Sequence, residues 1–275
     1  MSLPAIDAHA HLWTDDVKRY PRAAGALDYP PPHFTAEDLF THSKPAGVSR
    51  IVLIQMSFYK FDNSYMLDCM KAHPGTFSGV GIVDEAGTDP GLAMEDLARQ
   101  GVRGFRIVGV NPQQAWLDSP GMNRMWRTAA ARNLSMCALI GPDALPSLDR
   151  MCAKYPDTSV VIDHFARVGV DGVIHDQDLR SLSALARHRK VKVKASAFYA
   201  LGKKKAPYTD LRPLFRNVFE HFGPRRMMWA SDCPFQLQDG HQYAPSIAFV
   251  REQLPFLSAE DREWVLSRTA QSVFF

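Results

Sequence analysis

The sequence predicts an α/β protein of the TIM-barrel class, with a (β/α)8 architecture. Short apolar runs rich in β-branched residues recur along the chain, and helical patterns lie between most of them, which is typical of βαβ units in a parallel sheet. Eight such runs occur in 275 residues, close to the ~250 residues of a single-domain barrel. The predicted strands are Ala5–His9, Ile51–Gln55, Ser78–Val83, Val102–Val108, Ser135–Ile140, Ser159–Asp163, Val191–Ser196 and Met227–Asp232.

The order and composition of these segments favour one closed barrel. Strands such as Ile51–Ile54 are apolar on both faces, which suits a barrel interior on one side and helices on the other. After the first strand, Tyr20–Phe34 is rich in Pro, Gly and Ala and is predicted to be a long loop over the C-terminal face. No repeat or linker divides the chain, so we expect one domain spanning residues 1–275. A doubly wound open sheet is the alternative, but no G-x-G-x-x-G or P-loop follows any strand.

Helix boundary signals are clearest in the second half of the chain. Thr209 is the predicted N-cap of a helix whose Leu and Phe residues recur at helical spacing until Gly223 ends it. Ser258, with Asp261 three residues later, resembles a capping box. It is expected to open a last helix through Leu266 that closes the barrel.

Composition argues against several classes of partner. The net charge is only +3 and the basic residues are scattered apart from Lys203–Lys205, so nucleic acid is not expected as a partner. No apolar stretch approaches the roughly 18 residues of a membrane span. The four cysteines lack C-x-x-C spacing and are expected to be reduced thiols. The first residues lack the layout of a signal peptide, so we expect a cytoplasmic protein.

Ionisable residues fall at the C-terminal ends of three predicted strands. His9 and His11 are two residues apart at the end of the first strand, so both side chains point to the same side and can converge on one ion or one substrate oxygen. His164 follows the sixth strand and Asp232 ends the eighth. Because barrel enzymes build their active sites at this face, we expect the four side chains to share one crevice.

These residues lie in segments that resemble the amidohydrolase superfamily, in the amidohydrolase-related branch that includes 2-pyrone-4,6-dicarboxylate lactonase and sugar-acid lactonases. The resemblance spans nearly the whole chain and implies an amidohydrolase-like barrel. The segments that carry it are Asp7–Trp13, Gln55–Ser57 with Asp62-Asn63, Gly101–Arg106, Asp163–Arg167 and Trp229–Pro234.

The resemblance implies roles for the strand-end residues. His9 and His11 would bind a metal ion or the substrate carbonyl. Asp232 would be the general base, and His164 would assist in catalysis. If a metal ion is present, all four side chains are candidate ligands.

Substrate contacts are implied for four further residues. Arg106 and Arg167 match positions that hold substrate carboxylates, for which a planar guanidinium group is well suited. Ser57 and Tyr199 would also contact the substrate. Relatives tend to carry an arginine directly after this tyrosine, whereas this chain has Ala200, which weakens the case for a dicarboxylate.

Departures from the family restrict the metal content. Binuclear members bridge two ions with a carboxylated Lys or a Glu on the fourth strand, but that strand ends here in Arg106-Ile107-Val108. The fifth strand, ending at Ile140, offers no histidine. We therefore expect either one divalent metal ion, Zn²⁺ or Mn²⁺, or none.

The predicted function is hydrolysis of a small lactone or related ester, with a carboxylated lactone as the expected substrate. Asp232 would take a proton from water, while a metal ion or the histidines stabilise the oxyanion. A metal-dependent decarboxylase or hydratase of the same superfamily is one alternative, and a non-catalytic barrel that binds a small acid is another. The sequence leaves a homo-oligomer open. Candidates for an aromatic pocket are Tyr59, Phe61, Trp116, Phe198, Tyr199, Phe235 and Tyr243.

Overall fold

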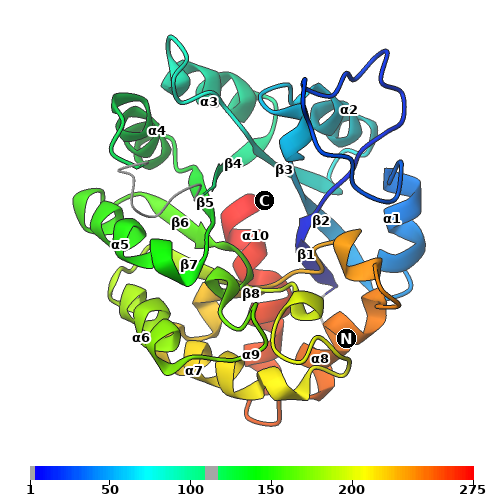
Figure 1. Cartoon of the computed structure of the whole chain (residues 1–275), viewed down its shortest axis with the longest axis vertical. Helices are drawn as coiled ribbons and strands as arrows, with labels where there is room; N and C mark the ends of the chain where they lie inside the picture. Colours follow the sequence, from blue (N-terminus) through cyan, green and yellow to red (C-terminus); the bar gives the residue numbers. More distant parts are fainter. Residues whose placement is uncertain (1–3, 109–116) are drawn as a thin grey trace.

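Eight parallel strands form one sheet in chain order, and helices surround it (Figure 1). The structure is a computed structural model and describes residues 4–108 and 117–275. The strands are β1 (Ala5–Ala10), β2 (Val48–Ile54), β3 (Phe77–Gly81), β4 (Val102–Val108), β5 (Ser135–Leu139), β6 (Ser159–Ile162), β7 (Val191–Ala195) and β8 (Met227–Trp229). The predicted TIM barrel is therefore confirmed.

The barrel closes through the segment that follows β8. The Asp232 N–H donates to the His9 carbonyl at 2.8 Å, and the His11 N–H donates to the Cys233 carbonyl at 2.7 Å. Ala10 and Cys233 also form a parallel bridge. The end of the eighth strand therefore lies beside β1.

Helices follow the strands, and most of them lie on the outside of the barrel, whereas the last one packs against one end of it (Figure 1). They are α1 (Ala36–Ser43), α2 (Ser64–Ala72), α3 (Pro90–Arg99), α4 (Pro120–Ala131), α5 (Leu145–Lys154), α6 (Asp176–Ala184), α7 (Arg212–Phe222), α8 (Tyr243–Glu252), α9 (Ala259–Glu263) and α10 (Thr269–Phe274). Among the described residues, no helix has both the length and the apolar composition needed to cross a membrane.

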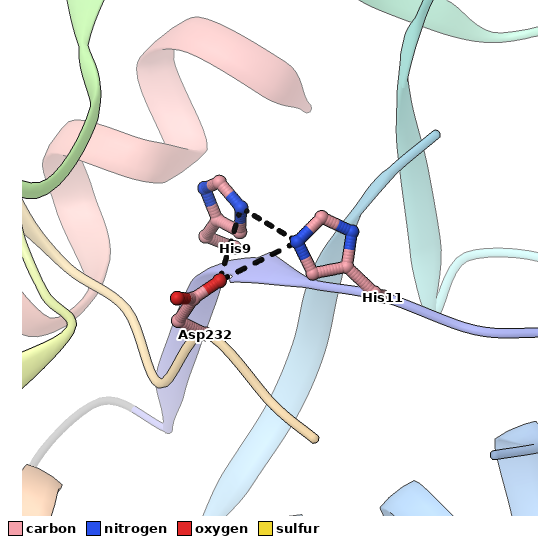
Figure 2. Close-up of side chains that lie close together, drawn as sticks. All are labelled: His9, His11 and Asp232. Atoms are coloured by element: carbon pink, nitrogen blue, oxygen red, sulfur yellow. Dashed lines mark hydrogen bonds and ion pairs between the residues drawn. The ribbon is translucent and has the colours of Figure 1, made fainter. Parts of the chain in front are cut away.

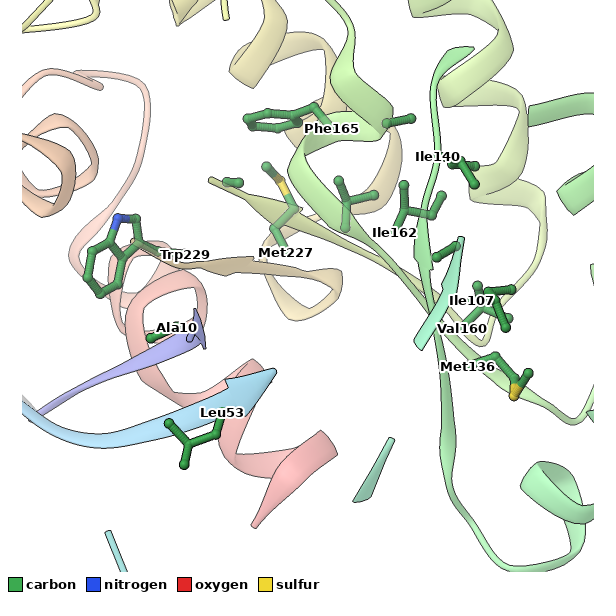
Figure 3. Close-up of a cluster of buried hydrophobic side chains, with 14 of the residues drawn as sticks. Ala10, Leu53, Ile107, Met136, Ile140, Val160, Ile162, Phe165, Met227 and Trp229 are labelled. Carbon is green, nitrogen blue, oxygen red and sulfur yellow. The ribbon is translucent and has the colours of Figure 1, made fainter. Parts of the chain in front are cut away.

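Two apolar layers hold the barrel together. On β6, Val160 and Ile162 pack outward against the helices, while Val161 points inward. On β8, Met228 points inward and its two neighbours pack outward. Figure 3 shows part of the outer layer, including Ile162 and Trp229. This alternation explains why the strands are apolar on both faces.

The C-terminal segment closes one end of the barrel. The Ser258–Asp261 capping box is present, as predicted, at the start of α9. The helical path does not end at Leu266, however, but continues through a π-turn into α10. Ala270 and Phe274 of α10 pack into the inner apolar layer.

Several predicted boundaries were wrong. Thr209 is not an N-cap: it begins a 3₁₀ turn, and α7 starts only at Arg212. β8 ends at Trp229, three residues before the predicted end, and Asp232 has a left-handed backbone with φ of 65° that excludes it from a strand. By contrast, Tyr20–Phe34 is a loop, as predicted, between β1 and α1.

Candidate active site

Two histidines and one carboxylate converge at the C-terminal end of the barrel (Figure 2). The Nε2 atoms of His9 and His11 are 3.1 Å apart. Asp232 Oδ1 lies 3.3 Å from His9 Nε2 and 3.4 Å from His11 Nε2. All three side chains are buried, and the three atoms are close enough together to hold one cation.

Backbone geometry at the ends of β6, β7 and β8 aims side chains at this point. His164 is the second residue after β6 and begins a left-handed turn in which four consecutive residues, through Arg167, have φ between 52° and 58°. Ala197 after β7 has φ of 54°, and Asp232 has φ of 65°. Each such non-glycine residue costs about 1–3 kcal/mol, and such strain is typical of functional sites.

His164 joins His9, His11 and Asp232, and these four side chains are called the active-site floor below. Its Nδ1 lies 2.8 Å from Ser196 Oγ, and its Nε2 lies 3.8 Å from Asp232 Oδ2. The ring centroids of His164 and His9 are 4.6 Å apart. The structure therefore brings together all four strand-end residues that the sequence singled out.

Burial and neighbouring charge fix the protonation of this cluster. Burial lowers the pKa of His9, His11 and His164 below the ordinary value of 6.5. Burial raises the pKa of Asp232, but the neighbouring His164, His11 and His9 outweigh it and hold that pKa below its ordinary value of 3.8. At neutral pH the carboxylate is ionised and the rings are neutral, which is the state that can accept a proton or ligate a metal.

A cavity of about 480 Å³ opens above this floor. It contains all four predicted substrate contacts, namely Ser57, Arg106, Arg167 and Tyr199, in addition to His11, His164 and Asp232. The Tyr199 hydroxyl donates to Asp232 Oδ2 at 2.7 Å. The remaining described wall is mostly apolar and consists of Tyr29, Met56, Val108, Leu139, Val170, Ala197, Ala200, Leu201 and Phe235.

Two arginines of the cavity, Arg106 and Arg167, are available to a ligand. Burial lowers the pKa of Arg106, and its Nε is buried without a hydrogen-bond partner among the described residues. Neither Arg106 nor Arg167 forms an ion pair with another described residue. Two guanidinium groups that line one cavity and form no ion pair with another described residue favour an anionic ligand.

The predicted aromatic pocket is correct only in part. Tyr199 and Phe235 line the cavity, and Tyr29 from the long loop joins them without having been predicted. Among the described lining residues, Tyr59, Phe61, Phe198 and Tyr243 are absent, and Trp116 lies outside the described residues.

Three buried charged residues beneath the site were missed by the sequence reasoning. Asp7 accepts hydrogen bonds from Ser231 N at 2.8 Å and from the Tyr243 hydroxyl at 2.8 Å, and so ties β1 to the segment after β8. Lys194 Nζ lies 3.0 Å from Asp163 Oδ1, and both side chains are fully buried. The available signal was Lys194 itself, because a lysine on an inner strand face needs a buried partner.

Comparison with known proteins shows the family of this chain. A family model described as amidohydrolase matches residues 6–275. The chain belongs to the amidohydrolase family. It is 30% identical over 249 residues to an L-fucono-1,5-lactonase of Burkholderia ambifaria, covering 86% of this chain and 82% of the relative.

One further relative and one solved structure match most of this chain. It is 29% identical over 247 residues to a 2-pyrone-4,6-dicarboxylate hydrolase of Comamonas testosteroni, covering 84% of this chain and 76% of the relative. A solved amidohydrolase from Burkholderia multivorans with bound zinc is 22% identical and superposes with a TM-score of 0.81, covering 99% of each chain. The curated relatives are enzymes, and so is this member of the family.

Proposed function

We propose that this protein is a hydrolase that opens a small carboxylated lactone by attack of water, with Asp232 as general base. The observation that carries the proposal is the convergence of His9 Nε2, His11 Nε2 and Asp232 Oδ1 within 3.1–3.4 Å of one another. Of this cluster, His11 and Asp232 line a cavity that also holds two arginines, while His9 is fully buried. The relatives named as a lactonase and as a pyrone dicarboxylate hydrolase support the substrate class.

The proton transfer is assigned to Asp232. Its lowered pKa keeps the carboxylate ionised at neutral pH, so it can accept a proton from water as the oxygen attacks the lactone carbonyl. Tyr199 holds Oδ2, and Oδ1 faces the two histidines. When Ser196 donates to His164 Nδ1, the proton of that ring lies on Nε2, which can then donate to the developing oxyanion.

The donor set also fits one divalent cation. Two imidazole nitrogens and one carboxylate oxygen suit Zn²⁺ or Mn²⁺, and separations of 3.1–3.4 Å are compatible with ligands about 2.0–2.2 Å from one ion. His9, His11 and Asp232 would hold it, with His164 beside them. When bound, such an ion would supply Lewis-acid polarisation and a lowered pKa for water.

Substrate recognition is assigned to the cavity. Arg106 and Arg167 would bind the carboxylate of the lactone, and Ser57 would add a hydrogen bond. Ala200 leaves the β7 side of the cavity without a third cation, so one carboxylate is favoured over two. Residues 1–275 are proposed to act as one catalytic domain.

A panel of carboxylated five- and six-membered lactones tests the proposal. We expect ring opening with incorporation of ¹⁸O from labelled water, and we expect Asp232→Asn to lower kcat by roughly 10²–10⁴-fold. The matched control is Asp239→Asn on the exposed loop after β8, which should retain activity. Full activity of Asp232→Asn would remove the base assignment.

The same panel separates the alternatives. Release of carbon dioxide without ¹⁸O incorporation would identify a decarboxylase. Saturable binding of acids without turnover would identify a non-catalytic binding protein. Metal analysis of protein purified without chelators, with the His9→Ala/His11→Ala variant as control, tests for one equivalent of zinc or manganese.

A further inference from the structure

A fully buried ion pair lies directly beneath the active-site floor. Lys194 on β7 is among the largest side chains with no exposure at all, and its Nζ lies 3.0 Å from Asp163 Oδ1. The same ammonium lies 3.2 Å from His9 Nδ1. Burial of a lysine costs free energy unless its charge is paired, so the ion pair with Asp163 holds the ammonium group in this position beside His9.

The contact determines where the His9 ring carries its proton. An ammonium group only donates hydrogen bonds, so His9 Nδ1 must accept from Lys194. The neutral His9 ring then has its proton on Nε2.

The partner histidine supports the same assignment. His11 Nδ1 lies 2.9 Å from the Ile54 carbonyl, which only accepts, so His11 donates there and has a lone pair on Nε2. The 3.1 Å contact between the two Nε2 atoms needs one donor, and His9 supplies it. One chain of donors therefore runs from Lys194 through His9 and His11 to Ile54.

Metal ligation requires the opposite tautomer of His9. A histidine ligand offers an unprotonated nitrogen and donates from its other nitrogen to a neighbouring acceptor. His11 already meets this condition through Ile54. His9 would have to move its proton to Nδ1, where Asp163 Oδ1 at 3.5 Å is the available acceptor.

We propose that Lys194 is a positioning residue that sets the tautomer of His9 and thereby weakens divalent-cation binding at the His9–His11–Asp232 site. Lys194 stabilises the metal-free tautomer, and Asp163 stabilises the metal-binding tautomer. The inference rests on the ligand set of the proposed function but not on the reaction. Its tests use no substrate, so its failure would leave hydrolysis of a lactone by Asp232 standing.

Zinc affinity is the first test. In protein stripped with a chelator and titrated with Zn²⁺ alone, Lys194→Met should bind more tightly than the wild type by roughly 10- to 100-fold, the usual size of an effect from a partner of a metal ligand. Lys192→Met is the matched control, because Lys192 lies on the same strand but contacts Ser159 instead of His9. It should leave the affinity unchanged.

A second control separates tautomer from charge. Arg106→Gln also removes a positive charge near the site, but in the described part of the chain Arg106 makes no contact with His9 Nδ1. Its affinity gain should be smaller than that of Lys194→Met. Equal gains, no gain in Lys194→Met, or no zinc binding by any variant would overturn the proposal.

The ¹⁵N shifts of the His9 ring test the tautomer directly, with the resonances assigned by comparison with His9→Gln. In metal-free protein, the wild type should carry its proton on Nε2 and Lys194→Met should carry it on Nδ1. A proton on Nδ1 in the wild type would contradict the inference. If Lys194→Met does not fold, Lys194→Met/Asp163→Asn removes both charges together, and a gain in affinity of less than about 10-fold is expected because the amide oxygen accepts the Nδ1 proton more weakly than the carboxylate does.

Discussion

At the scale of single residues, Asp232 is under two constraints. Its Oδ1 faces His9 and His11, whereas its Oδ2 accepts from the Tyr199 hydroxyl at 2.7 Å. Burial raises the pKa of Tyr199, so its hydroxyl stays a donor across the working pH range. Tyr199 therefore orients the carboxylate so that Oδ1 faces the two histidines.

Removal of that hydroxyl should affect turnover more than binding. A hydrogen bond to a charged group contributes about 1.5–3 kcal/mol, so we expect Tyr199→Phe to lower kcat by roughly 10- to 100-fold, with a smaller change in KM. Steady-state kinetics on the lactone identified in the panel measures this. Tyr59→Phe is the control, because the Tyr59 hydroxyl bonds to Thr14 N and lies outside the cavity lining. Equal loss in both variants would point to a general packing effect.

The sequence could predict the site residues at strand ends but not the layer beneath them. His9 and His11 were recognisable because two histidines at strand spacing must share a face. Lys194 was overlooked because lysines are usually solvated, and its role depends on a neighbour from another strand. Asp163 stands next to His164 in sequence, but its side chain contacts Lys194 and His9 below the floor.

At the scale of elements, the segments after β6, β7 and β8 combine left-handed backbones with site residues. Their strands were predictable from the sequence, because short apolar runs bounded by turn residues mark them. The exact ends were not readable, because Ala197 and Asp232 are not residue types that signal a positive φ as strongly as glycine does.

Ala197 gives a test of this backbone strain. A left-handed backbone costs a non-glycine residue about 1–2 kcal/mol, so Ala197→Gly should raise the free energy of unfolding by about 1 kcal/mol. Urea denaturation of the metal-free protein measures the change. Ala230→Gly is the control: Ala230 is buried without a positive φ, and it should lose stability. Destabilisation of both variants alike would show that position 197 stores no strain.

The capping boxes illustrate what local sequence can and cannot specify. Ser258 and Asp261 form the predicted box because both partners lie within one turn of the chain. Thr209 was predicted as an N-cap without such a partner, but a 3₁₀ turn precedes α7 and moves the start of the helix to Arg212. A single polar residue fixes a helix start less firmly than a reciprocal pair does.

At the scale of the whole molecule, the active site links stability to pH. The three floor histidines have a pKa below 6.5 because burial disfavours their charged form. Below pH 6.5 these three histidines therefore bind more protons in the unfolded chain than in the folded chain. This histidine contribution to the free energy of unfolding is fully present above pH 6.5 and is lost as the pH falls.

Other buried groups act in different windows. Burial raises the pKa of Asp7 to about 6, so the folded state binds an extra proton below that value and gains stability as the pH falls toward 3.8. The lowered pKa values of Asp163 and Asp232 contribute stability that is fully present above pH 3.8 and is lost only as the pH falls below it. Between pH 7 and pH 5, the loss of stability from the three histidines is therefore opposed only by the gain from Asp7 among these groups.

We expect the free energy of unfolding to fall between pH 7 and pH 5. Each histidine that stays neutral in the folded protein contributes a loss of about 2 kcal/mol over this range, which exceeds the opposing gain from Asp7. Urea denaturation of metal-free protein at both pH values measures the difference. His11→Asn should show a shallower dependence, because one of the three groups no longer titrates. A wild-type stability that is flat or rises toward pH 5 would mean that the histidines accept protons in the folded state, with Asp232 as their counter-ion.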